Sequence, residues 1–147
     1  MDFESAMMEC QERQQEIERL FVACNDDEKR YEKIIEMGRS ALPLNDKYKI
    51  PENNVPGCQS LMFMHAWMEK ERIYFAAESE ALISSGLAQL LIKVYSGSTP
   101  EVVLKCPPEF LDRLHLNSML SPNRASGLYS IHLKMKQQAL KLLLAKS

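Results

Sequence analysis

The residue best suited to chemistry is Cys58, which stands in the stretch VPGCQS at residues 55–60. A thiolate is a strong nucleophile, and a cysteine just after a Pro-Gly turn lies on a loop, where reactive groups concentrate. The apolar run LMFMHAWM follows at residues 61–68, so the same thiol would equally suit a small buried hydrophobe. The local sequence leaves both interpretations open.

Arg124 is a second candidate, at the end of the stretch SPNR. Ser121 is the expected N-cap of the last helix, which places Arg124 at the third helical position. A cation there adds to the positive end of the helix dipole, so this helix start favours anions. A solvated surface arginine is the simpler interpretation on local grounds. If the two segments meet, Arg124 would favour a thiolate or persulfide anion at Cys58.

The other cysteines do not suggest a metal centre, which needs several converging ligands. Cys10 and Cys24 are both expected on the first helix, where fourteen residues separate them by about 21 Å. Cys24 is expected in the core and Cys106 at a plain turn, whereas Cys10 has no explanation. The three histidines are far apart in sequence and are expected to be half-buried or at the surface. We therefore expect neither a metal nor a cofactor in this chain.

Length and composition exclude several classes of function. The chain of 147 residues suits a single domain, with 46% hydrophobic and 26% charged residues. A net charge of −2 argues against nucleic acid as the partner. No apolar run reaches the ~18 residues of a membrane span. The start MDFESAMMEC has neither secretory nor transit features, so we expect a cytoplasmic protein with reduced thiols.

The elements that must position Cys58 begin with two helices. Helical spacing of apolar residues predicts a first helix over residues 5–24 and a second over about 26–40, capped by Asn25. So short a link predicts an antiparallel helical hairpin. Residues 41–57 hold three prolines and several turn formers, so they are expected to form a long loop that leads to Cys58.

Two strands are expected after Cys58, over residues 60–68 and 73–77, with the charged turn EKER at 69–72. Both faces of the first strand are apolar, so both are expected to be covered. A third strand over residues 53–56 is left open. The side chains expected to alternate between the two faces are Leu61, Phe63, His65 and Trp67 against Met62, Met64, Ala66 and Met68.

Helices fill the rest of the chain. Ser79 is expected to cap a buried helix over about 80–96, and Thr99 to cap a short helix that begins with Pro100. The chain is therefore expected to be α+β, with a small antiparallel sheet packed against helices. Its one domain, residues 1–147, would comprise the hairpin of helices (about 5–40), the loop 41–57, the strand hairpin 60–77 and C-terminal helices over 80–146.

Four segments together resemble the SufE family of sulfur acceptor proteins. They are RYEKIIEMGRSALPL (30–44), NNVPGCQSLMFM (53–64), GLAQLLIKVYSGSTPEVV (86–103) and LSPNRASGLYSI (120–131). Their order and spacing are also those of the family, and the resemblance covers roughly residues 15–140. The GCQS core with its upstream asparagine and the SPNR helix start are, taken together, fairly specific for this family.

The resemblance implies a fold like that of the U-type iron–sulfur scaffolds and an accessory protein rather than a stand-alone enzyme. Cys58 would receive sulfur as a persulfide from a cysteine desulfurase of the SufS or CsdA type, whose PLP belongs to that partner. The protein would stimulate the desulfurase and pass sulfur to an iron–sulfur scaffold complex. Gly57, Gln59 and Arg124 would support Cys58. The resemblance also allows a weak homodimer.

The residues around Cys58 suggest how the relay would work. Cys58 would rest against the strand residues that follow it, Leu61 or Phe63, and would swing out on the Pro56-Gly57 turn when the desulfurase docks. The loop 41–57 would form part of the docking surface. This sequence departs from the family at residues 78–80, where Glu-Ser-Glu replaces the frequent Asp-Ser-Asp.

Three alternatives remain open. A U-type cluster scaffold needs about three converging cysteines, which the sequence does not suggest. A thiol peroxidase or disulfide exchanger would want a CxxC or a clear resolving cysteine, and neither is evident in the sequence. A helical adaptor without chemistry would leave Cys58 inert.

Overall fold

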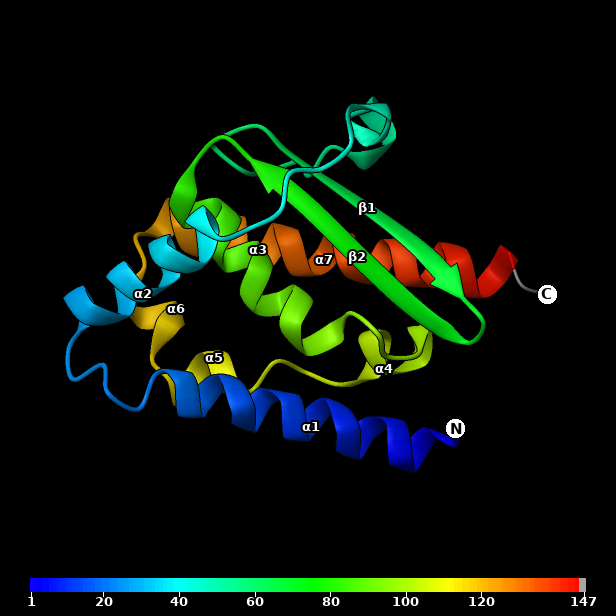
Figure 1. Ribbon diagram of the computed structural model, residues 1–147, viewed down its shortest axis with the longest axis horizontal. Helices are drawn as coiled ribbons and strands as arrows, with labels where there is room; N and C mark the ends of the chain where they lie inside the picture. Colours follow the sequence, from blue (N-terminus) through cyan, green and yellow to red (C-terminus); the bar gives the residue numbers. More distant parts are fainter. Residues whose placement is uncertain (146–147) are drawn as a thin grey trace.

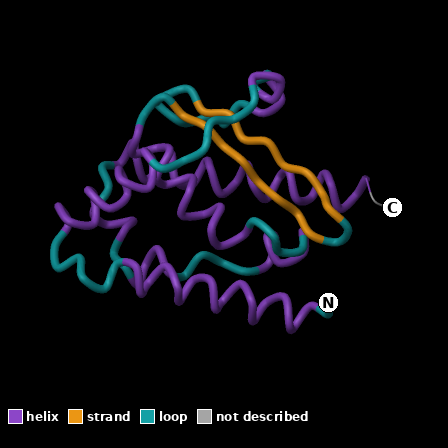
Figure 2. Tube along the Cα trace, in the orientation of Figure 1, coloured by secondary structure: helices purple, strands orange, loops and turns teal. Residues whose placement is uncertain are grey.

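The α+β class expected from the sequence is confirmed by the computed structural model, which describes residues 1–145 (Figure 1). Within that part of the chain, seven α-helices accompany one two-stranded antiparallel sheet. The buried helix α3 and the long last helix α7 lie on one side of the sheet, and the loop between α2 and β1 lies on the other (Figures 1 and 2).

The sheet is formed by β1, Met62–Glu69, and β2, Arg72–Ser79, with Met62 opposite Ser79 and Glu69 opposite Arg72. The turn therefore has two residues rather than the expected four. Residues 53–56 form no strand; Asn54 only makes an isolated bridge to Phe63. The side chains that face α3 and α7 are buried, and they are Met62, Met64, Ile73, Phe75 and Ala77.

The outer face of the sheet is only partly covered, which corrects the expectation that both faces are buried. Its rings form a stack that runs from Tyr48, in the short 3₁₀ helix Asp46–Tyr48, over His65 and Trp67 to Tyr74. Successive ring centroids lie 3.6, 5.3 and 5.9 Å apart. Tyr48 thereby attaches the loop 41–57 to β1.

Two N-terminal helices are present, but they do not form the expected hairpin. Helix α1 spans Phe3–Leu20, so Cys24 lies beyond its end. Helix α2 spans Asp27–Arg39 and is capped by Asp26, whose carboxylate accepts from Lys29 N; Asn25 is not the cap. Helix α2 packs mainly against α3 rather than α1. Gly38 and Gly86 have no side chain, so the backbones of α2 and α3 can approach each other closely.

Helix α3, Leu82–Tyr95, is the buried helix that the apolar pattern predicts. It begins two residues later than expected, with Ala81 as N-cap. Ser79 is instead the last residue of β2, and its hydroxyl oxygen accepts from Ala81 N at 3.3 Å. Ser79 therefore pairs with Met62 in the sheet instead of capping the helix.

Four further helices complete the described chain. Thr99 and Ser121 cap helices as expected, since their hydroxyls accept from Val102 N and Arg124 N, both at 3.3 Å. The expected end of the last helix at residue 146 lies outside the described residues. No helix within residues 1–145 is both long and apolar enough to cross a membrane. The four helices are α4 (Pro100–Lys105), α5 (Phe110–Arg113), α6 (Leu116–Met119) and α7 (Pro122–Ala145).

Candidate functional site

Cys58 lies on a short loop that leaves and re-enters the sheet edge at one point. Val55 is buried, and its N–H donates to the carbonyl of Met62 at 2.9 Å, which closes the base of the loop 56–61. Gly57 has φ +86°, a conformation that glycine adopts without strain. Pro56 and Gly57 are exposed, whereas Cys58 is half-buried. The turn therefore brings the thiol inward from an exposed tip.

The loop contacts α7 at two positions, and a glycine takes part in each contact. The Cys58 Sγ lies 4.0 Å from the carbonyl oxygen of Gly127, and a β-carbon at Gly127 would itself lie 4.0 Å from that sulfur. A β-carbon at Gly57 would collide with the hydroxyl of Ser130. The absence of a side chain at Gly57 thus allows this loop to approach the helix, whereas the space beside Gly127 would also hold a β-carbon.

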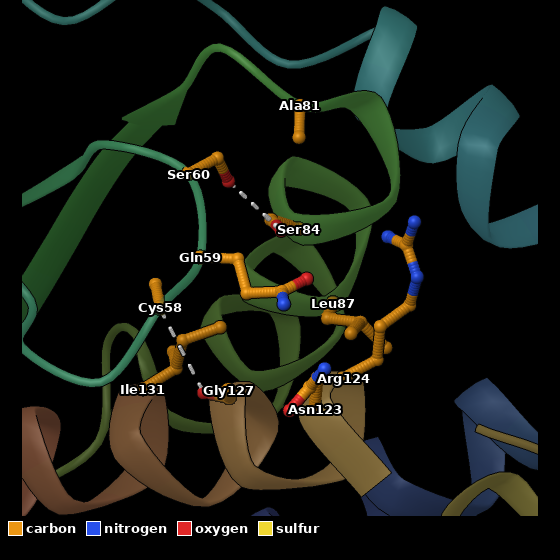
Figure 3. A pocket seen from close by; sticks show the side chains of 10 residues that line it. All are labelled: Cys58, Gln59, Ser60, Ala81, Ser84, Leu87, Asn123, Arg124, Gly127 and Ile131. Atoms are coloured by element: carbon orange, nitrogen blue, oxygen red, sulfur yellow. Dashed lines mark hydrogen bonds between the residues drawn. The ribbon is translucent and has the colours of Figure 1, made fainter. Parts of the chain in front are cut away.

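Cys58 opens into a cavity of about 190 Å³ between the loop, α3 and α7 (Figure 3). Its lining combines polar groups with apolar side chains, a mixture typical of a small-ligand site. The loop contributes Cys58, Gln59 and Ser60, the start of α3 contributes Ala81, Ser84 and Leu87, and α7 contributes Asn123, Arg124, Gly127 and Ile131.

Ser60 holds the far end of the loop. Its hydroxyl lies 3.2 Å from the Ser79 hydroxyl and donates to the Ser84 hydroxyl at 3.3 Å. Gln59 points into the space between the loop and α3 (Figure 3). The loop is therefore fixed at Val55 and at Ser60, while the turn at Pro56 and Gly57 stands free of such bonds among the described residues.

The electrostatic setting keeps the Cys58 thiol protonated. Burial raises its pKa above the ordinary value of a thiol. Arg124 lines the same cavity, so the two segments do meet, but its guanidinium points away from Cys58 and lies 6.0 Å from the ring centroid of Tyr31 (Figure 3). Arg124 therefore does not supply the cation that would favour a thiolate in this arrangement.

The shelter of Cys58 differs from the one expected. The larger apolar side chains that line its cavity are Leu87 of α3 and Ile131 of α7, whereas Leu61 and Phe63 do not line it. Leu61 is 48% exposed. The alternating pattern of the strand could not show this, because the cover comes from two helices that follow much later in the chain.

Glu78 fastens the long loop that leads to Cys58. Its carboxylate accepts from Leu44 N at 2.9 Å and pairs with Lys49 Nζ at 2.6 Å. These contacts hold the pKa of Glu78 below its usual range, chiefly through the Lys49 ammonium. The position at which the sequence departs from the frequent Asp-Ser-Asp pattern is thus an anchor for residues 44–49.

Among residues 1–145, no group of three or more His, Cys, Asp or Glu side chains converges with metal-site geometry. Ser84, Gly127 and Ser130 contact or line the loop, and none of them is predicted from the sequence as a site residue. Gly127 had a signal, since it falls in the segment SPNRASG, whereas Ser84 and Ser130 had none.

A family model described as SufE, Fe-S metabolism associated domain, matches residues 15–139. SufE-like protein 1, chloroplastic/mitochondrial, of Arabidopsis thaliana is 35% identical over 129 residues, which cover 87% of this chain but only 35% of that protein. The chain thus spans about a third of that relative's length.

Two further matches cover most of both partners. An uncharacterized SufE-like protein of Synechocystis sp. is 33% identical over 122 residues, covering 83% of this chain and 77% of that protein. The solution structure of a hypothetical protein from Thermus thermophilus superposes with a TM-score of 0.73 at 25% identity, covering 90% of this chain and 96% of the other.

Proposed function

Because the chain belongs to the SufE family, whose domain is associated with Fe–S metabolism, we propose that Cys58 is a persulfide-forming sulfur acceptor. The donor is the persulfide of a PLP-dependent cysteine desulfurase. The observation that carries this function is the placement of Cys58, half-buried at a cavity of about 190 Å³ beside a free Pro-Gly turn.

The chemical step is a thiol exchange on a persulfide. The Cys58 thiol loses its proton, and the thiolate attacks the outer sulfur of the donor's cysteine persulfide. A new S–S bond forms at Cys58 while the donor's S–S bond breaks. The donor cysteine leaves as a thiolate, which takes up a proton. No net oxidation occurs, because the outer sulfur moves with its oxidation state unchanged.

Positioning of the Cys58 thiol against the donor persulfide accelerates this step more than a lower thiol pKa does. Lowering a thiol pKa by one unit raises its reactivity only about threefold, because intrinsic nucleophilicity falls at the same time. Holding two sulfurs in attack geometry supplies several kcal/mol. A Cys58 that is protonated and sheltered at rest supports a mechanism in which the loop 56–61 swings outward on Gly57 when the donor docks.

The cavity suits the product as well as the resting thiol. Its volume accommodates one additional sulfur atom, and its apolar walls at Leu87 and Ile131 would keep water and stray thiols from a persulfide. Gln59 and the Ser60–Ser84 pair offer hydrogen-bond donors near it. Arg124 would act only after its side chain turns from Tyr31 towards the cavity.

The proposal includes partners at both ends of the relay. The protein stimulates the desulfurase by removing its sulfur, docks in part through the loop 41–57, and passes sulfur to an iron–sulfur scaffold complex. It needs no cofactor of its own, and a weak homodimer remains compatible with it. The cytoplasm is its proposed compartment, which fits four cysteines that are all free thiols.

Intact-mass analysis tests this function. Incubation with a cysteine desulfurase and cysteine should add one sulfur atom to the protein, and peptide mapping should place it on Cys58. Cys58→Ser should gain none, and Cys24→Ser, the other half-buried cysteine, should gain it at the wild-type rate. A Cys58→Ser protein that still accepts sulfur would contradict the proposal.

A further inference from the structure

The structure joins two cysteines that the sequence left apart. Cys10 lies in the middle of α1, and Cys106 caps the C-terminus of α4. Their exposed fractions are 0% and 3%. The amide nitrogen of Gln14 lies 4.0 Å from Cys10 Sγ and 3.4 Å from Cys106 Sγ, so one side chain contacts both sulfurs. The plain turn expected at Cys106 is thus half of a thiol pair, and Cys10 acquires a partner.

Gln14 holds this pair in place. It lies one turn after Cys10 on α1 and is only 3% exposed. Its amide nitrogen donates to Cys106 Sγ at 3.4 Å and to the Pro107 carbonyl at 3.0 Å, and its amide oxygen accepts from Phe110 N at 3.1 Å. Every polar atom of this buried side chain therefore serves to fix the segment around Cys106 against α1.

The two sulfurs are unequal. The Cys10 thiol donates to the Cys106 sulfur, and the Gln14 amide donates to it as well, so the pKa of Cys106 falls below its ordinary value. The same hydrogen bond, together with burial, raises the pKa of Cys10. The pKa of Cys58 is also raised, and burial is its cause. Cys106 is thus the more readily ionised member of the pair, with a protonated thiol directly beside it.

Cys106 is also the member that a small solute can reach. It lines a cavity of about 230 Å³ whose rim carries polar and charged side chains. Gln11, Gln15, Glu109 and Arg113 belong to that rim. The volume of this cavity is sufficient for a molecule as small as hydrogen peroxide.

We propose that Cys10 and Cys106 form a peroxide-reactive dithiol site that is separate from Cys58. The Cys106 thiolate attacks a peroxide oxygen, the O–O bond breaks, and Cys106 becomes a sulfenic acid while hydroxide leaves. The Cys10 thiol then attacks the sulfenic sulfur, a disulfide forms, and water is released. In total, two thiols and one hydrogen peroxide give one disulfide and two waters, and a thiol reductant restores the pair.

The test uses the full chain with Cys24→Ser and Cys58→Ser, so that Cys10 and Cys106 are the only cysteines that remain. A stoichiometric amount of hydrogen peroxide should lower the intact mass by two hydrogen atoms. Peptide mapping should find one disulfide between Cys10 and Cys106, and dithiothreitol should restore the original mass. Oxygen adducts on Cys106 without a disulfide, or no reaction at all, would overturn the assignment.

Two further measurements separate the roles of the two sulfurs. Adding Cys10→Ala to that protein should stop the reaction at one or more oxygens on Cys106. In the wild-type chain, limiting peroxide should produce the Cys10–Cys106 disulfide before any oxygen is added to Cys58. Prior oxidation of Cys58 would count against the site, and this second measurement needs no variant to fold.

Discussion

Gly57 and Ser130 lie in direct contact, so that a β-carbon at position 57 would collide with the Ser130 hydroxyl and stand 3.3 Å from the Ser130 β-carbon. The positive φ of Gly57 adds a second reason for glycine at this position. The neighbouring thiol of Cys58 meets α7 at Gly127, another residue without a side chain. The resting position of the thiol therefore depends on the glycine at position 57, whereas a β-carbon at position 127 would meet the sulfur only at an ordinary 4.0 Å.

Gly57→Ala should release the Cys58 loop from α7. The substitution forces a side chain into a left-handed conformation, which costs about 1–2 kcal/mol, and adds the collision with Ser130. We expect Cys58 to lose its cover, its pKa to fall towards the ordinary value, and its alkylation by iodoacetamide to accelerate severalfold. Peptide-resolved mass spectrometry measures that rate.

Gly97→Ala is the matched control for Gly57→Ala. Gly97 has nearly the same φ, +87°, but its nearest neighbour is the Arg13 side chain, far along the chain from Cys58. It should cost similar backbone strain and leave the alkylation rate of Cys58 unchanged. Equal rates for Gly57→Ala and the wild type would show that the Ser130 contact does not seat the thiol.

Cys58 should titrate above the ordinary pKa of a thiol in the folded protein, because burial disfavours its thiolate. The midpoint of its alkylation rate against pH should therefore lie at a higher pH in the folded chain than in the chain unfolded by urea. Arg124→Ala should not move this profile, since the guanidinium lies over Tyr31. A folded midpoint below the unfolded one would instead point to a cation at the sulfur.

The same shift gives the sign of a stability effect. The unfolded chain releases the Cys58 proton at a lower pH than the folded chain does. The contribution of the neutral thiol to stability is thus complete below the unfolded pKa and is lost as the pH rises through the folded pKa. Cys58→Ser should accordingly weaken the alkaline decline in the free energy of unfolding.

Glu78→Gln should loosen the loop 41–57. It removes the negative charge that pairs with Lys49 Nζ at 2.6 Å, a solvent-screened contact whose loss should change local order more than global stability. Hydrogen exchange over residues 44–49 should accelerate. Since the pKa of Glu78 is depressed, this stabilisation is present above the unfolded pKa and is lost as the pH falls through the folded pKa. Glu80→Gln, an exposed neighbour, is the control and should change neither property.

Gly86→Ala should destabilise the crossing of α2 and α3. A β-carbon there would collide with the carbonyl oxygen of Ile34, and overpacking of this kind costs about 1–3 kcal/mol or more. Gly127→Ala is the matched helical control, because its β-carbon would meet only Cys58 Sγ at an ordinary 4.0 Å. It should raise stability by about 0.5–1 kcal/mol through helix propensity. Urea unfolding measures both, and equal signs would contradict the packing at Gly86.

The sequence predicts the elements better than their contacts. The strand alternation, the buried α3 and the caps at Thr99 and Ser121 depend on residues within one turn or one pleat, so local patterns reveal them. The sequence does not distinguish the cap at Asp26 from its neighbour Asn25, because both side chains can accept a hydrogen bond from the first turn of a helix. The local pattern favours Ser79 as a helix cap, because its place in β2 depends on a partner, Met62, across the hairpin.

The candidate site shows the same division. The turn at Gly57 and the candidate thiol follow from six consecutive residues, whereas the meeting of Arg124 with the Cys58 cavity could only be stated as a condition. The direction of the Arg124 side chain depends on Tyr31, which lies on another helix. The meeting of Cys10 with Cys106 depends on how α1 lies against α4 and α5, which no spacing along the chain encodes.

The stack on the outer face of the sheet gives this protein an intrinsic optical probe. Trp67 is the only tryptophan of the chain, and its ring lies 5.3 Å from that of His65, which in turn carries Tyr48 of the loop 41–57. Indole emission responds to the rings packed around it. Displacement of Tyr48 by a docking partner would therefore change the fluorescence of Trp67, and the arrival of that partner can be timed without attaching a dye.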